Sequence, residues 1–203
     1  MPLSLAVLGD SIAYGMGASD PADTVGARLT AELVTSGTPT DLRVFAVSGA
    51  CSDALATQVQ AATAWGADVA LIIIGANDLT HFVPVQQAAA QLGAAVRALR
   101  LGGARVVVCP APDLSVVPWV PPYMRVAVQA ASTVLRQAQA SVATTEGARI
   151  ADAQASLGTA FAGDLSLFSA DRFHPSSAGY ALISAALAPT VLAVAAEVVD
   201  QGG

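Results

Sequence analysis

The stretch LAVLGDSIAYG, residues 5–15, begins as an uninterrupted apolar run and changes character at Gly9-Asp10-Ser11. An apolar run without alternation is typical of a strand that is buried on both faces. In sheets of such strands, ligands bind outside the carboxyl ends of the strands. We therefore interpret Gly9, Asp10 and Ser11 as the end of a buried strand that presents an acid and a hydroxyl at one edge of a sheet.

Further apolar runs follow this stretch, and longer alanine-rich segments of helical period separate them. The runs cover residues 42–49, 68–75, 104–111 and 148–153. Helices are predicted near residues 23–35, 53–65, 84–101, 123–145 and 176–199. The alternation predicts a three-layer α/β/α fold with a five-stranded parallel sheet. Because the chain has 203 residues, 54% of them hydrophobic, and no low-complexity linker, we expect one domain over residues 1–203.

The charged residues and cysteines exclude several classes of function. The net charge of −6 argues against a nucleic-acid partner, which requires a basic surface. The positive residues are all arginines, so mechanisms that depend on a lysine, such as Schiff-base chemistry, are excluded. The two cysteines, Cys51 and Cys109, are too few for a disulfide framework, and we interpret them as small buried side chains.

Apolar segments near the two ends of the sequence bear on the cellular location of the protein. The first apolar run lacks a basic segment before it and ends at Asp10, so it is interpreted as a strand, and a cytoplasmic protein is expected. The uncharged stretch from Ala178 to Ala196 is long enough to span a bilayer. It contains Pro189, and no Lys or Arg follows it, so we expect a packed terminal helix and no integral membrane span.

A second motif lies in the segment SADRFHPSS, where Asp171 and His174 are three residues apart. In a turn, a carboxylate at this spacing can fold back onto the imidazole, which fixes the tautomer of the ring and stabilises imidazolium. Such a pair activates a hydroxyl nucleophile, and Ser11 is predicted at the same edge of the sheet. Ser11, His174 and Asp171 are therefore the candidate catalytic residues.

In four segments the sequence resembles the SGNH hydrolases, also called GDSL esterases and lipases. The matching segments, in chain order, are GDSIAYG at 9–15, the glycine of AVSGACS at 49, GAND at 75–78 and DRFHP at 171–175. The resemblance implies a flavodoxin-like SGNH hydrolase fold. It also implies that Ser11 is the nucleophile, that His174 is the base and that Asp171 orients it.

The resemblance further implies an oxyanion hole, formed by the backbone N–H groups of Ser11 and Gly49 and the side-chain amide of Asn77. The expected activity is hydrolysis of a small-molecule ester through an acyl-enzyme, with no metal and no organic cofactor. Asp10 and Asp78 lie within the first and third of these segments, and they are interpreted as carboxylates that brace the turns. The sequence carries no signal for an oligomeric state.

Other functions remain open at this point. A metallophosphoesterase would use Asp10, Asn77, Asp78 and His174 as ligands, although the chain has only two histidines. An acyltransferase or a deacetylase acting on a carbohydrate or lipid acceptor would share every catalytic residue. A non-catalytic ligand-binding domain would have no need of a serine together with a histidine-acid pair. The other histidine, His81, competes as the base, but its nearest acid at a suitable spacing is Asp78.

The segment from Pro110 to Met124 follows a predicted strand end and contains five prolines, so we expect a rigid loop that borders the site. Its apolar side chains are predicted to form a wall for an acyl chain, with core packing beneath the loop as the alternative. These side chains are Val116, Val117, Trp119, Val120, Tyr123 and Met124, of which Trp119, Tyr123 and Met124 are the principal candidates. Short or medium acyl groups, of up to about eight carbons, are expected.

Overall fold

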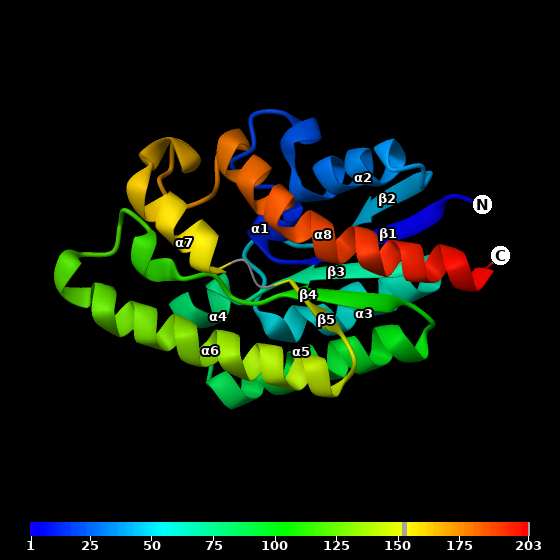
Figure 1. The fold of residues 1–203 in the computed structure, drawn as a ribbon. Coiled ribbons are helices and arrows are strands. Elements are labelled where there is room, and N and C mark those ends of the chain that lie inside the picture. The colour runs from blue at the N-terminus through cyan, green and yellow to red at the C-terminus, as the bar shows by residue number, and fades with distance from the viewer. Residues whose placement is uncertain (152–153, 203) are drawn as a thin grey trace.

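The structure, a computed structural model, describes residues 1–151 and 154–202. One parallel sheet of five strands forms its centre, in the order β2-β1-β3-β4-β5 (Figure 1). The strands are β1 (Leu3–Gly9), β2 (Thr40–Val44), β3 (Val69–Ile73), β4 (Arg105–Cys109) and β5 (Arg149–Ile150). Every neighbouring pair is parallel. The predicted fold class is confirmed, and the strand order is that of a flavodoxin-like fold.

Helices cover both faces of the sheet (Figure 1). One layer contains α3 (Leu55–Trp65), α5 (Val85–Leu101) and α6 (Arg125–Thr145). The other contains α2 (Val25–Thr35), α7 (Gln154–Gly163) and α8 (Ser177–Gly202). Two short helices, α1 (Ser11–Tyr14) and α4 (Ala76–Thr80), begin directly beyond the ends of β1 and β3. Short 3-10 turns lie at Pro21–Asp23, Ser52–Ala54, Leu114–Val116, Pro122–Met124 and Leu165–Leu167.

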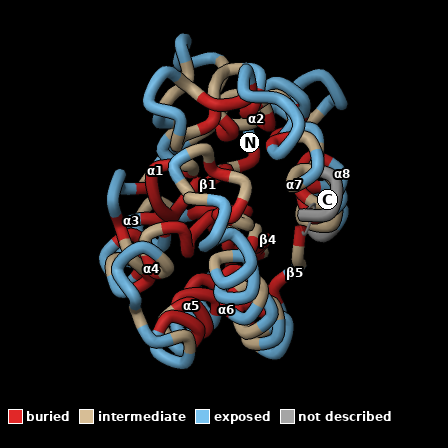
Figure 2. The backbone as a smooth tube through the Cα atoms, turned by 90° about the vertical axis from the view of Figure 1, so that its left-hand side faces the viewer, coloured by how far each residue is buried: buried red, intermediate tan, exposed pale blue. Residues whose placement is uncertain are grey.

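The apolar strands supply two cores, one on each face of the sheet. Side chains alternate along a strand, so Leu5 and Val7 of β1 pack in the cluster with α2 and α8. Ala6 and Leu8 of the same strand pack in the cluster with α3 and α5. Figure 2 shows that the buried residues concentrate in the sheet and on the inner faces of the helices. Burial on both faces explains why these strands have no alternating polar positions.

Helix α8 is the segment that the sequence marks as long enough for a bilayer. Ser177–Asp200 meets that criterion by length and composition. In the structure, one face of the helix packs in the larger core, through residues that include Tyr180, Leu187 and Val191. The packed terminal helix is therefore as predicted, and the apolar composition of that face has a structural explanation.

Three elements differ from the sequence prediction. Strand β2 ends at Val44 and not at residue 49, because it is an edge strand and the chain turns away, although Val47 N–H still donates to Gly9 O. The predicted strand 148–153 is reduced to Arg149–Ile150, and its positions 152 and 153 lie outside the described residues. Helix α7 was not predicted.

The carboxyl ends of the strands and the chain termini lie at opposite edges of the sheet. Figure 1 shows both termini at one end of the molecule, and α1, α4 and α7 toward the other. The motif residues follow the strands at the second end, so they gather where a parallel sheet places its ligands.

Candidate active site

The turn that carries Ser11, the predicted nucleophile, is called the nucleophile turn; it begins at Gly9, where β1 ends. Gly9 has a φ of +133°, and a Cβ at this position would lie 1.8 Å from the carbonyl oxygen of Ile73, so no other residue fits. Asp10 is the N-cap of α1, and its Oδ1 accepts a hydrogen bond of 3.0 Å from the backbone N–H of Ile12. This cap fixes Ser11 as the first residue of α1, where its side chain is buried but for 3%.

The Asp171 and His174 side chains meet as the spacing predicts. Asp171 Oδ2 lies 2.6 Å from His174 Nδ1. Asp171 Oδ1 accepts hydrogen bonds from the backbone N–H groups of Phe173 and His174 and from the hydroxyl of Ser169. Partial burial raises the pKa of Asp171, but the hydrogen bonds from His174, the two N–H groups and Ser169 outweigh it and hold that pKa well below its usual range. The carboxylate is therefore ionised and fixes the imidazole ring.

The segment after α1 packs directly against the turn that carries His174. A Cβ on Gly17 would lie 2.4 Å from the Pro175 carbonyl oxygen and 3.0 Å from His174 Cβ. The Tyr180 hydroxyl donates a hydrogen bond of 2.8 Å to the carbonyl oxygen of Met16. Among the described residues no hydrogen bond joins Ser11 to His174. The structure thus brings the two motif segments into contact, and the proton transfer between these side chains stays a prediction.

The Gly49 and Asn77 loops are joined to each other. Asn77 Nδ2 donates a hydrogen bond of 3.1 Å to the carbonyl oxygen of Ala50, next to Gly49. Asp78 is buried and accepts from both the backbone N–H and the hydroxyl of Ser52. Asp78 therefore braces these loops, as Asp10 braces the nucleophile turn. The oxyanion roles of Gly49 and Asn77 remain predictions.

The other histidine lies differently. His81 is exposed, and its Nδ1 lies 2.9 Å from the carbonyl oxygen of Asn77 and 3.2 Å from the Thr80 hydroxyl. Its ring nitrogen is thus engaged with neutral oxygens, whereas His174 meets a carboxylate. This difference favours His174 as the base.

Asp10 is a buried carboxyl group next to the site, and one of its oxygens has no hydrogen bond among the described residues. Its side chain is 1% exposed, and its Oδ2 has no hydrogen-bond partner among the described residues. Burial raises the pKa of Asp10 from 3.8 to about 6, although the N–H groups of Ile12, Ala76 and Gly75 oppose this and Asp78 adds to it. The folded state therefore holds this proton more tightly than the unfolded chain.

We expect Asp10→Asn to remove a pH dependence of stability. A raised carboxyl pKa stabilises the fold below the unfolded value near 3.8, and this contribution is lost as the pH rises through about 6. Relative to the variant, the wild type should lose about 2 kcal/mol of unfolding free energy between pH 4 and pH 7. Urea unfolding at several pH values measures it, with Asp53→Asn, at an exposed position, as the control. Parallel curves for wild type and Asp10→Asn would contradict the assignment.

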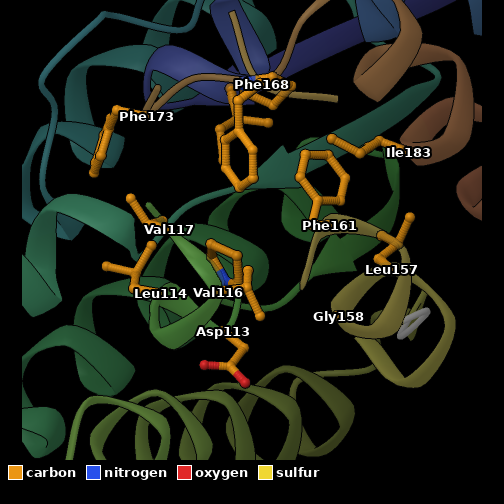
Figure 3. Close-up of a pocket in the computed structure, with 13 residues that line it drawn as sticks. Asp113, Leu114, Val116, Val117, Leu157, Gly158, Phe161, Phe168, Phe173 and Ile183 are labelled. Atoms are coloured by element: carbon orange, nitrogen blue, oxygen red, sulfur yellow. The ribbon is translucent and has the colours of Figure 1, made fainter. Parts of the chain in front are cut away.

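An apolar pocket with a volume of about 90 Å³ opens beside the nucleophile turn (Figure 3). Its wall includes Ile12, which follows Ser11, and Phe173 and Pro175, which flank His174. The loop after β4 and helix α7 supply much of the remainder. Those lining residues are Pro112, Asp113, Leu114, Val116, Val117, Leu157, Gly158, Phe161, Phe168 and Ile183. Figure 3 shows three phenylalanine rings, Phe161, Phe168 and Phe173, around this space.

The principal residues predicted for the acyl wall do not line this pocket. Trp119, Tyr123 and Met124 are 69%, 85% and 44% exposed. The same loop contributes Val116 and Val117 instead, because the loop turns these side chains inward as it crosses the sheet edge. The predicted loop thus borders the pocket through Val116 and Val117, two of the side chains proposed for the wall, and not through the principal candidates.

Helix α7 supplies wall residues that the sequence prediction missed. Leu157 and Phe161 lie one turn apart on this helix, and Gly158 lies between them. Their i, i+4 spacing in LGTAF was the available signal of one apolar helix face.

For metal ions, the described residues contain no group of three or more His, Cys, Asp or Glu side chains arranged to bind one.

The segment that carries Ser11 packs against the turn with the Asp-His pair, and the Asn77 loop follows the end of the neighbouring strand β3. This arrangement is the one expected of a serine hydrolase. The chain belongs to the GDSL-like lipase/acylhydrolase family, whose model matches residues 7–182.

A curated relative comes from Mycobacterium tuberculosis (strain H37Rv) and is named GDSL-like esterase Rv1075c. It is 35% identical to this chain over 182 residues, which are 88% of this chain. The chain spans 58% of the length of that relative.

Solved structures share the fold. A crystal structure of TesA has a TM-score of 0.78 at 22% identity, over 94% of this chain and 99% of that one. The lipase/acylhydrolase from Enterococcus faecalis has a TM-score of 0.74 at 19% identity, over 95% of this chain and 96% of that one. At this level of identity the likeness concerns the fold.

Proposed function

We propose that this protein hydrolyses carboxylic esters of short- to medium-chain acyl groups through an acyl-enzyme on Ser11. The observation that carries the proposal is the apolar pocket, whose wall is shared by the residue after Ser11 and the two residues that flank His174. An acyl chain in this pocket would place its carbonyl carbon between the nucleophile turn and the base. Family membership and the esterase name of the curated relative support the same chemistry.

In the proposed first step, Ser11 Oγ attacks the ester carbonyl carbon, and His174 Nε2 takes the hydroxyl proton. Asp171 holds the Nδ1 side of the ring through the 2.6 Å contact, which leaves Nε2 for the substrate side. Hydrogen bonds of this kind often tighten only when substrate binds, so their absence between Ser11 and His174 here is compatible with the mechanism.

The tetrahedral oxyanion would be bound by the N–H groups of Ser11 and Gly49 and by Asn77 Nδ2. An amide nitrogen has two hydrogens, and Ala50 O accepts only one of those of Asn77. The alcohol then leaves with the proton from His174. A water molecule, deprotonated by the same ring, attacks the acyl-enzyme and releases the acid.

Labelling with a fluorophosphonate, located by mass spectrometry, tests the class and the nucleophile together. The expected result is one phosphonyl adduct on Ser11 of the wild type. An unlabelled protein, or an adduct on another serine with Ser11 free, would refute the proposal. Ester hydrolysis that a chelator abolishes would instead favour the metallophosphoesterase alternative.

The size of the pocket leads to a prediction about acyl chain length. In a series of p-nitrophenyl esters from acetate to palmitate, kcat/KM should peak at or below about eight carbons, because each enclosed methylene adds about 0.8 kcal/mol or less until the wall is reached. Phe161→Ala enlarges the pocket and should move the peak to longer chains.

The matched control is Trp119→Ala, which removes another aromatic side chain at a position outside the pocket. Its peak should coincide with that of the wild type. A peak moved by Trp119→Ala and not by Phe161→Ala would restore the wall predicted from the sequence. A maximum at palmitate that appears only above the micellar threshold would make this protein an interfacial lipase.

A further inference from the structure

Two glutamines in helices are almost fully buried at the carboxyl edge of the sheet. Gln58 of α3 is 4% exposed, and Gln139 of α6 is fully buried. A buried side-chain amide is costly unless its donor and its acceptor are both paired. In both residues the two amide atoms bind the main chain at the end of a strand, and not another side chain.

Gln58 binds both main-chain groups of Gly9. Its Oε1 accepts from Gly9 N–H at 2.7 Å, and its Nε2 donates to Gly9 O at 2.9 Å. These groups point toward β2, which has already ended at Val44. The side chain thus takes the place of a strand neighbour at Gly9 N–H, and it shares Gly9 O with the backbone N–H of Val47, at the residue that leads into Asp10 and Ser11.

Gln139 stands between two strands that separate. The last register pair of β3 and β4 is Ile73 with Cys109. The next ladder bond would join Ala111 N–H to Ile74 O. Gln139 inserts its amide here instead: Oε1 accepts from Ala111 N–H at 2.8 Å, and Nε2 donates to Ile74 O at 3.2 Å.

This insertion sets where two functional loops diverge. The chain after Ile74 leads to Asn77, and the chain after Ala111 leads to the pocket residues Val116 and Val117. The spacing at this point is tight, since a Cβ on Gly75 would lie 2.6 Å from Ala111 Cβ and 3.0 Å from Gln139 Nε2. A shift of the amide would therefore move the start of both loops.

We propose that Gln58 and Gln139 are positioning residues of the esterase site, an inference that rests on the function proposed above. Gln58 fixes the peptide before the nucleophile turn, and Gln139 fixes the loop of the oxyanion donor Asn77 against the pocket loop. Neither side chain lines the apolar pocket, so both act through the backbone.

The test replaces each glutamine with methionine, which is close in volume and has no amide. In hydrolysis of p-nitrophenyl butyrate, Gln58→Met and Gln139→Met should each lower kcat by at least about tenfold and change KM by less than about twofold, since the transition state alone requires the aligned groups. The matched control is Gln91→Met on α5. Gln91 has a buried Oε1 without a hydrogen-bond partner among the described residues. The kcat of Gln91→Met should therefore stay close to that of the wild type.

Coupling separates positioning from a general loss of structure. If Gln139 acts through Asn77, Gln139→Met should cost less than about twofold in kcat when Asn77 is already alanine, because the group it aligns is gone. An equal loss in both backgrounds would refute the role of Gln139. Should Gln139→Met fail to fold by circular dichroism, Gln139→Glu keeps the acceptor for Ala111 and replaces the amide donor to Ile74 with a carboxyl group, and the same comparison applies.

For Gln58, the rate of fluorophosphonate labelling at Ser11 should fall in parallel with kcat. Labelling at the wild-type rate in folded Gln58→Met would refute its role. An active wild type with unaffected glutamine variants contradicts only this inference. A wild type that neither hydrolyses esters nor becomes labelled contradicts the proposed function, and the inference with it.

Discussion

Ser11→Ala is expected to lower kcat for ester hydrolysis by about 10⁴-fold or more, as removal of a triad nucleophile does in other serine hydrolases. The fold should be little affected, because alanine fits the first position of α1 and the Asp10 cap binds the backbone of Ile12 and not the serine side chain. Hydrolysis of p-nitrophenyl butyrate and urea unfolding measure the two effects.

Ser184→Ala is the matched control for this variant. Ser184 is another buried serine, and its Oγ has no hydrogen-bond partner among the described residues. It lies on α8, so its loss should leave kcat unchanged. Wild-type activity in Ser11→Ala would show that the proposed mechanism is wrong.

His174→Ala should cause a loss of similar size, about 10⁴-fold in kcat, because the variant lacks the proposed acceptor of the Ser11 proton. Asp171→Asn should also be severely impaired, because the backbone N–H groups of Phe173 and His174 would hold the amide oxygen and leave the amide nitrogen, a donor, facing Nδ1, which favours the wrong tautomer. His81→Ala provides the comparison. Its ring is exposed and contacts Asn77 only through the carbonyl oxygen, so most activity should remain. Activity that survives in His174→Ala and is lost in His81→Ala would reverse the assignment.

The fold was predictable because its strands are buried on both faces. Continuous apolar runs such as residues 68–75 have few other structural uses in a chain of this size. The end of β2 was less predictable, since an edge strand ends where its neighbour stops pairing and not where its apolar residues stop. Helix α7 is short, and its glycines and small residues weaken the periodic signal on which a sequence prediction depends.

In the site too, some features depend on the local sequence and others depend on the tertiary fold. Asp171 and His174 were predictable because their contact forms within one turn. The pocket wall was predictable only in part: Val117 lines it as predicted, but Trp119 does not, because the direction of these side chains depends on how the loop crosses the sheet edge. Gln58 and Gln139 carry no sequence signal, since a glutamine in a helix is ordinarily a surface residue and only the assembled sheet places it at a strand end.

The placement of both termini at the edge of the sheet away from the site has a practical consequence (Figure 1). A tag, a fusion partner or a chemical linker joined at either end would extend away from the pocket and leave its mouth free. The chain also has no lysine, so amine-reactive surfaces can couple to it only through the α-amino group. Immobilisation through that amine would attach the chain at the edge of the sheet away from the site.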